Sequence, residues 1–157
     1  MRKLTGIILL GLAAGAAGCS KPELGVAKFA DGQVQHVVSA KDIPWKSCPP
    51  HLPKNCEIAI LSGHPKQPDM FTVRFRAPEE MYMSAHTHPK DERVTLLQGT
   101  VRVAFGEGAT REEARVFGPG DYYINKRGAV HKVWIEKGAV LQITGIGPWE
   151  VHFVDKH

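Results

Sequence analysis

Short stretches in which apolar and polar residues alternate run through most of this 157-residue chain, and turn residues separate them. The clearest stretch is Phe71 to Arg76, where every second residue is apolar, as in a strand with one buried face. The chain has 16 glycines and 11 prolines, which suits frequent tight turns. No segment longer than about one turn shows the helical spacing of apolar residues. The sequence therefore predicts one all-β domain, either a sandwich or a barrel.

The same pattern predicts about ten strands. A strand-like stretch begins at Gln33, where Val34, His36 and Val38 are the residues that fit an alternating pattern. Residues 94–97 and 100–105 flank Gln98-Gly99 and are expected to pair as a hairpin, and residues 110–114 fit a single helical turn. The strands expected after this N-terminal stretch are 57–61, 71–76, 81–86, 94–97, 100–105, 115–117, 122–124, 131–135, 139–146 and 150–154.

Residues 1–18 are predicted to be a secretory signal peptide and not part of the fold. Arg2 and Lys3 are followed by an apolar stretch from Leu4 to Ala14 and then by small residues. This stretch is too short for a membrane span of about 20 apolar residues. Residues 19–32 are then expected to form a tether, and residues 33–157 the folded domain.

The end of the signal resembles the lipobox of bacterial lipoproteins. The run Ala16-Ala17-Gly18-Cys19 ends in a cysteine, which such proteins carry as a lipidated first residue. Ser20 follows, where lipoproteins kept in the inner membrane typically have Asp. The resemblance therefore implies a protein anchored by its lipid in the outer membrane, facing the periplasm. The alternative is ordinary cleavage near Gly18, which would give a soluble periplasmic protein.

The charge of the chain argues against nucleic acid as a partner. The formal net charge is +4, and loss of Arg2 and Lys3 with the signal leaves +2. The remaining basic residues are scattered along the sequence and form no stripe interleaved with aromatic residues.

Two further cysteines, Cys48 and Cys56, lie close together in the sequence. They enclose a short proline-rich stretch that contains His51. An exported protein meets an oxidising compartment, so the pair is predicted to form a disulfide. The alternative is a metal site made of both thiols and His51, which lacks a fourth ligand and has wider spacing than most thiolate zinc sites.

The residues that carry chemistry are three histidines and one glutamate. His86 and His88 are two residues apart, so on a strand both rings point to the same face. Glu92 follows shortly after, and His131 lies in a later predicted strand. Three imidazoles and a carboxylate suit one divalent transition metal such as Fe, Mn, Ni, Cu or Zn. On an octahedral ion, four protein ligands leave open positions for water or a substrate.

This set of residues resembles the two motifs of the cupin superfamily. In the first, His86, His88 and Glu92 are followed after six residues by Gly99; only the leading glycine is replaced, by Glu80. The second motif is matched by Gly120, Gly128 and His131, with Lys126 in place of its proline and Ile135 in place of its asparagine.

The resemblance implies a cupin β-barrel, also called a double-stranded β-helix or jelly roll, with a metal on His86, His88, Glu92 and His131. It also implies a homodimer.

Other residues near the motifs are weaker candidates for the site. Tyr82 has the parity of His86 and is expected either to line the lumen or to pack in the core. Arg74 is expected to point into the cavity toward an anionic substrate, or else outward into solvent. Gln142 is a candidate hydrogen-bond partner behind a metal ligand. The parity of Met81 and Met83 places them on the face opposite the ligands, as packing residues.

The expected function is that of a small-molecule metalloprotein. The cupin resemblance implies an enzyme of dioxygenase or other oxidoreductase type, because an open metal position in an apolar barrel can bind O2. The alternatives are a non-redox isomerase or lyase, and a non-catalytic module that binds or senses a small molecule. Few acid–base candidates accompany the ligands: Tyr82, Arg74, Tyr122 and Tyr123. The catalytic residues stay unassigned.

The lipid anchor gives the first prediction. The Cys19→Ser variant should lose lipid labelling and be released as soluble protein, because serine offers no thiol for the lipid. Metabolic labelling with a fatty acid and membrane fractionation would measure both properties. Equal membrane association of the variant and the natural chain would show that the lipobox assignment is wrong.

Overall fold

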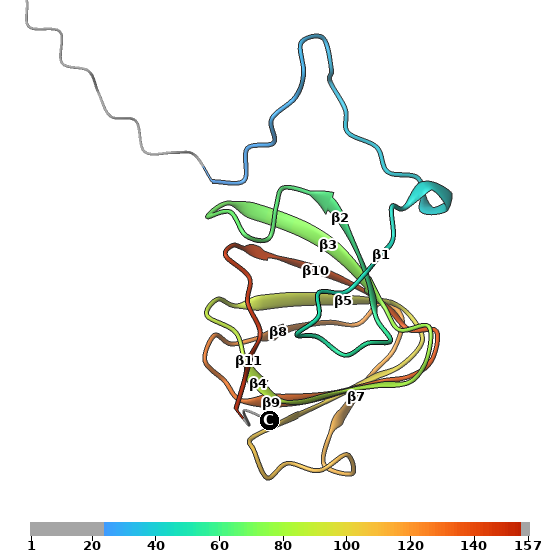
Figure 1. Ribbon diagram of the computed structural model, residues 1–157, viewed down its shortest axis with the longest axis vertical. Helices are drawn as coiled ribbons and strands as arrows, with labels where there is room; N and C mark the ends of the chain where they lie inside the picture. The colour runs from blue at the N-terminus through green and yellow to red at the C-terminus, as the bar shows by residue number, and fades with distance from the viewer. Residues whose placement is uncertain (1–23, 155–157) are drawn as a thin grey trace, which may run out of the picture.

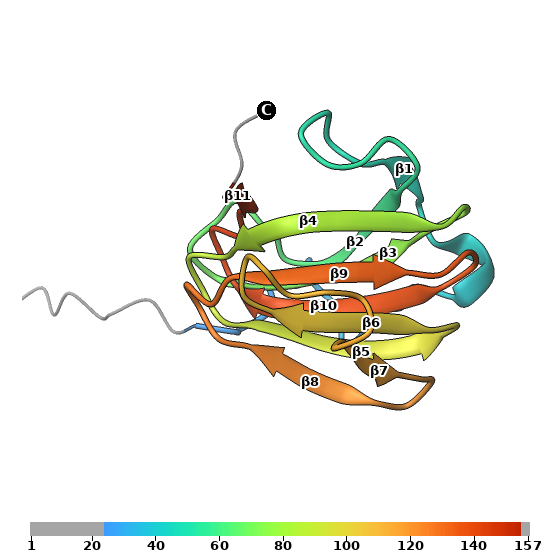
Figure 2. The same ribbon diagram turned by 90° about the horizontal axis from the view of Figure 1, so that it is seen from below.

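The computed structural model describes residues 24–154, and Cys19 with the predicted signal lies outside this part. Two antiparallel sheets pack face to face, as Figures 1 and 2 show. The predicted all-β jelly-roll fold is confirmed. One sheet contains, in order, β1 (Lys46–Ser47), β2 (Glu57–Ser62), β3 (Met70–Arg76), β10 (Val140–Ile146), β5 (Glu92–Gln98) and β8 (Tyr122–Asn125). The other contains β11 (His152–Phe153), β4 (Met81–Thr87), β9 (His131–Ile135), β6 (Val101–Phe105) and β7 (Arg115–Phe117).

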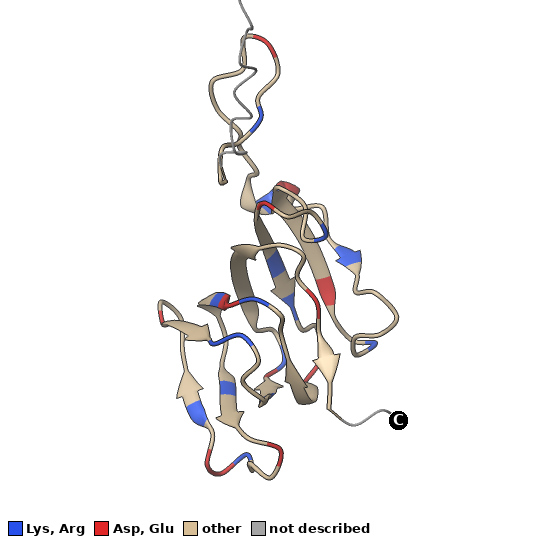
Figure 3. Ribbon diagram, turned by 90° about the vertical axis from the view of Figure 1, so that its left-hand side faces the viewer, with Lys and Arg blue, Asp and Glu red and all other residues tan. Residues whose placement is uncertain are grey.

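The core lies between the two sheets and follows from alternation along each strand. In β3, Phe71, Val73 and Phe75 are buried, and the residues between them are not. Leu141 and Ile143 of β10 point to the same interior. Burying each such side chain contributes about 1.5–3 kcal/mol. Outside the core, acidic and basic residues are interspersed over the strands and loops (Figure 3).

The expected hairpin between residues 94–97 and 100–105 is wrong. β5 pairs with β10 and β8, whereas β6 pairs with β9 and β7 in the other sheet. Gly99 joins the two strands with φ +78°, and a Cβ at this position would lie 2.7 Å from the Ala139 Cα. The close approach of these two segments requires glycine, and the chain crosses here from one sheet to the other.

Two other local predictions also fail. Residues 33–39 are not a strand, and Val34 and Val37 are 93% and 64% exposed. An alternating segment forms a strand only where a partner strand and an apolar surface are available to it. Residues 33–39 contact the sheet through a side chain: one His36 ring nitrogen lies 2.7 Å from the Leu61 carbonyl oxygen. Residues 110–114 form a turn in place of the expected helical turn. The only helix in the described part of the chain is a short 3-10 element, η1 (Ala40–Asp42).

The predicted disulfide is confirmed. Cys48 and Cys56 are bonded, with 5.5 Å between their Cα atoms. Cys56 is buried, and so is Leu52, at the middle of the enclosed loop, which joins the hydrophobic core. The disulfide therefore fixes a loop whose central residue is part of the interior.

Chemical analysis can test this bond. Thiol titration of the unfolded, unreduced mature protein should find Cys48 and Cys56 blocked. Reduction should lower the free energy of unfolding by about 2–3 kcal/mol, because the closed loop is short. Denaturant unfolding with and without reductant would measure the change, and the Cys48→Ser/Cys56→Ser double variant should match the reduced protein. Two free thiols before reduction would contradict the assignment.

Candidate metal centre

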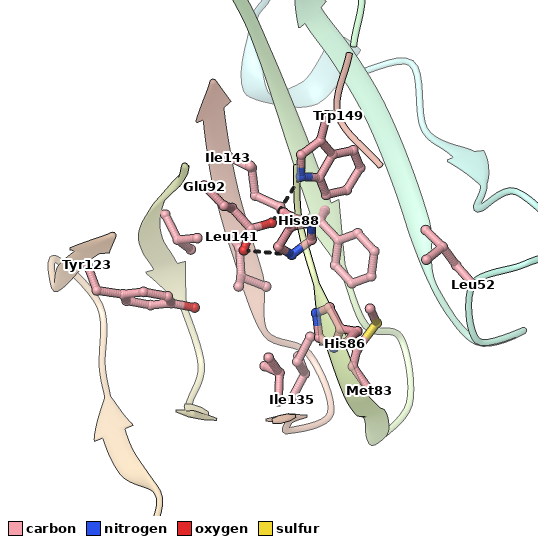
Figure 4. Close-up of a pocket in the computed structure, with 13 residues that line it drawn as sticks. Leu52, Met83, His86, His88, Glu92, Tyr123, Ile135, Leu141, Ile143 and Trp149 are labelled. Carbon is pink, nitrogen blue, oxygen red and sulfur yellow. Dashed lines mark hydrogen bonds and ion pairs between the residues drawn. The ribbon is translucent and has the colours of Figure 1, made fainter. Parts of the chain in front are cut away.

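The four predicted ligands come together at one end of the two sheets. His86 lies near the end of β4, and His131, the first residue of β9, is directly opposite it in the paired register. His88 follows β4, and Glu92 is the first residue of β5. All four are buried, with 6% exposure or less. Figure 4 shows His86, His88 and Glu92 around a common cavity.

A β-bulge in β4 brings this about. The register against β9 shifts between Met83 and His86, and Ala85 and His86 are buried in succession. The extra residue moves the following side chains to the other face of the strand. Met83 therefore lines the cavity together with His86, and Met81 is also buried. The expectation that these methionines lie on the face opposite the ligands is wrong.

The same bulge places Tyr82 outside. It is 46% exposed and stacks on Trp134 with 5.2 Å between the ring centroids. Both expectations for Tyr82, that it lines the lumen and that it packs in the core, are therefore wrong. Parity counted along the sequence fails here because a bulge breaks the two-residue period.

Arg74 and Gln142 also lie on the outer face of their sheet. Their neighbours Val73 and Phe75 fill the interior, so Arg74 points away from it. Arg74 Nε donates a hydrogen bond to Gln142 Oε1 across the paired strands, at 3.3 Å. Of the two positions expected for Arg74, the outward one is therefore observed and the one in the cavity is wrong; the expectation that Gln142 supports a ligand is also wrong.

Backbone carbonyls orient the three histidines. The Nδ1 atoms of His86 and His88 lie 2.7 Å from the carbonyl oxygens of Ser84 and Glu150, and His131 Nδ1 lies 3.0 Å from that of Ala129. A carbonyl only accepts hydrogen bonds, so each Nδ1 carries a proton, and in the neutral ring each Nε2 keeps a lone pair. The lone pair of His131 Nε2 accepts a hydrogen bond from Asn125 Nδ2 at 3.2 Å.

The ring nitrogens that do not contact a carbonyl, one from each histidine, converge on a common point. One ring nitrogen from each histidine lies within 4.8 Å of the others, which suits a shared metal ion. His88 Nε2 is buried and has no hydrogen-bond partner in the described part of the chain. A buried imidazole nitrogen without a partner costs free energy unless something binds it. Neutral imidazoles fixed through Nδ1 are the ordinary arrangement of metal-binding histidines, so the residues fit a divalent transition metal.

Two residues that sequence reasoning missed hold Glu92. Asn125 Nδ2 donates to Glu92 Oε2 at 3.0 Å, and Trp149 Nε1 donates to Oε1 at 3.2 Å. Glu92 Oε2 lies 3.4 Å from His88 Nε2, and the Trp149 ring stacks on His88 with a 12° angle between planes. Asn125 is 2% exposed. Asn125 directly follows the predicted strand 122–124, where a polar residue is a weak signal, and nothing in the sequence places Trp149 near the motif.

Burial and charge set the protonation of the cluster. Burial, and then the neighbouring His131, lower the pKa of His86 to about 4. Burial also lowers the pKa of His131. Burial opposes the charge on Glu92, but the combined effect of His88, His131 and Asn125 outweighs it and lowers the carboxyl pKa to about 2. Glu92 in turn raises the pKa of His88 against the effect of burial. A metal ion that binds His88 Nε2 therefore competes with a proton for this nitrogen.

An apolar cavity of about 40 Å³ adjoins the cluster. This volume holds about three water-sized groups. No lysine or arginine is among its lining residues. Besides the ligands His86, His88 and Glu92, the cavity is lined by Leu52, Phe75, Met83, Val94, Tyr123, Val133, Ile135, Leu141, Ile143 and Trp149.

Comparisons with known proteins agree with this arrangement. A family model described as the ChrR cupin-like domain matches residues 33–150. A comparison of the sequence with curated proteins gave no match. The polyketide cyclase RemF from Streptomyces resistomycificus superposes with a TM-score of 0.64 at 15% identity, covering 78% of this chain and 87% of that one.

Two further solved structures are also similar. An acetylacetone dioxygenase from Acinetobacter johnsonii has a TM-score of 0.60 at 18% identity, with 87% of this chain and 86% of that one covered. A chain in the complex of Rhodobacter sphaeroides SigE with the anti-sigma ChrR has a TM-score of 0.50 at 21% identity. That match covers 68% of this chain and 50% of the other. Likenesses at these identities show the fold.

Alanine variants can test the ligand set. His88→Ala and His131→Ala should weaken metal binding by at least about 100-fold, because loss of a ligand should cost no less than loss of a residue that orients one. Metal content after dialysis and titration of the apoprotein would measure the loss. His51→Ala is the matched control, since His51 is exposed in the disulfide loop and belongs to the alternative site there. Stoichiometric metal in the ligand variants would show that the site lies elsewhere.

Proposed function

Since this chain belongs to the family of ChrR cupin-like domains, we propose that it is a metalloprotein that acts on a small molecule. One divalent transition metal binds His86, His88, Glu92 and His131, and the small molecule occupies the adjoining cavity. The observation that carries this proposal is the convergence of three imidazole nitrogens, one from each histidine, beside an apolar cavity. The identity of the metal is open among Fe, Mn, Zn, Cu and Ni.

The first candidate activity is an oxygenase-type oxidation. A bound metal supplies Lewis acidity and, with Fe, Mn or Cu, redox chemistry. The residues of this chain contribute the rest: the histidines and Glu92 hold the ion, and apolar side chains such as Leu141 and Ile143 exclude water. Arg74 and Tyr82 point outward, so the cavity holds few groups for acid–base catalysis. This scarcity favours a reaction with O2 over an isomerase or lyase, which needs a positioned base.

The second candidate is a module that binds or senses a small molecule without catalysis. Its support is the match to the ChrR cupin-like domain, together with a similar structure that comes from a complex of a sigma factor with its anti-sigma partner. A metal-bound ligand in such a cavity can act as a signal as well as a substrate.

Oxygen uptake separates the two candidates. Apoprotein loaded with Fe(II) or Mn(II) would be mixed with acetylacetone, chosen because a similar structure is a dioxygenase for it, and with other small ketones. Oxygen consumption that requires the substrate and is lost in His88→Ala supports the oxygenase. Saturable binding of the same molecules without oxygen consumption supports the binding module. Absence of any metal binding would overturn both.

We also propose that the protein is exported and anchored by a lipid on Cys19 to the outer membrane. The pattern of residues 1–19 and the Cys48–Cys56 disulfide support export, because disulfides persist in oxidising compartments. Among residues 24–154, no helix is long and apolar enough to cross a membrane.

A further inference from the structure

Two consecutive tyrosines on β8 point in opposite directions. Tyr122 is 57% exposed on the outside of the sheet. Tyr123, which pairs with Val94 of β5, lines the cavity. Its ring packs on Phe117 with 4.2 Å between centroids, and this contact restricts the ring. Figure 4 shows the Tyr123 hydroxyl directed into the cavity, on the side where Glu92 lies.

The Tyr123 hydroxyl has no hydrogen-bond partner within residues 24–154. Tyr123 is half-buried at the edge of the sheet, and its hydroxyl end faces the cavity. Burial, and then the negative charge of Glu92, raise the pKa of Tyr123, so the hydroxyl keeps its proton and remains a donor. A donor at the wall of an otherwise apolar cavity can pair with an acceptor that enters the cavity.

The charge of the site limits what that acceptor can be. A divalent ion held by three neutral histidines and the Glu92 carboxylate leaves one net positive charge. No lysine or arginine lines the cavity to neutralise more. A ligand with two or more negative charges would therefore keep an unpaired charge away from water, which is unfavourable. A neutral or singly charged molecule of a few heavy atoms fits both the charge and the volume.

We propose that Tyr123 donates a hydrogen bond to the ligand of the metal site, and that this ligand is a small, neutral or singly negative molecule that binds through oxygen. This inference rests on the proposed metal site and specifies its substrate class. Carbonyl compounds, enolates and hydroxamates have this chemistry. Tyr123 is then a binding residue for the substrate, separate from the residues that hold the ion.

The test uses two small probes on Zn-loaded protein. Acetohydroxamate binds through oxygen and can accept a hydrogen bond from Tyr123. In contrast, 1-methylimidazole binds through its one basic nitrogen and has no N–H group or second acceptor to pair with the hydroxyl. Tyr123→Phe should weaken acetohydroxamate binding by about 3- to 10-fold, the worth of one hydrogen bond. It should leave the affinities for 1-methylimidazole and for Zn within about twofold, because neither of these two forms a hydrogen bond with the hydroxyl. Calorimetric titration measures all three dissociation constants.

Tyr122→Phe is the matched control, because it removes the neighbouring hydroxyl on the outer face and should change none of these constants. Equal acetohydroxamate affinity in Tyr123→Phe and the natural chain would overturn the role of Tyr123 while leaving the metal site intact. Equal weakening of both probes would also overturn it, since that pattern indicates a change in cavity shape. Tight binding of doubly charged oxalate, beyond the preference that free Zn shows for it, would contradict the charge limit. Failure of the natural chain to bind Zn would overturn the proposed function itself.

Discussion

The antiparallel pairing of β4 with β9 is the contact on which the site depends. It sets His86 opposite His131, so strands far apart in the sequence bring two imidazoles together. The bulge in β4 is part of the same contact, because it turns His86 inward after Met83 has also faced the interior. His88 and Glu92 then follow within one short connection between the sheets. A slip of one residue in this register would send His86 to the outer face, and the cluster would be lost.

Placing four polar side chains inside an apolar core has a free-energy cost, and the fold offsets it locally. Each histidine donates a hydrogen bond from Nδ1–H to a backbone carbonyl. Two of these carbonyls, those of Ser84 and Ala129, lie two residues before the ring that they orient. Glu92 has both oxygens hydrogen-bonded, by Asn125 and Trp149. Near the site, the buried side-chain atoms without a hydrogen-bond partner in the described part of the chain are His88 Nε2 and Asn125 Oδ1. The ring nitrogens and the carboxylate that fix the site are therefore paired, and His88 Nε2 is left for a ligand. The Tyr123 hydroxyl also faces the cavity.

Sequence reasoning reached the all-β class and most strand positions from local alternation, and the jelly roll and the three clustered histidines from the resemblance of two spaced motifs to those of cupins. Period-two alternation is visible at Phe71 to Arg76, and the His86-x-His88 spacing survives in the structure. It failed where the answer depends on a partner in space. The bulge that turns Tyr82 outward, the crossover at Gly99 and the contact of Trp149 with Glu92 are set by other strands and loops, and no local pattern encodes them. The position of Arg74 stayed open for a related reason: a charged residue on a strand can face either way until the sheet's partner is known.

The disulfide loop supplies a part of the cavity that no strand provides. Leu52 lines the cavity from the middle of the Cys48–Cys56 loop, and Figure 2 shows this loop beside β4, the strand that ends in His86. A short loop without regular structure would sample many conformations, and a cross-link at its base removes most of them. The position of Leu52, and with it one wall of the cavity, therefore depends on a covalent bond that forms only under oxidising conditions. Cavity shape and redox environment are coupled through this one side chain, whereas the metal ligands, held by the two sheets, do not depend on the loop.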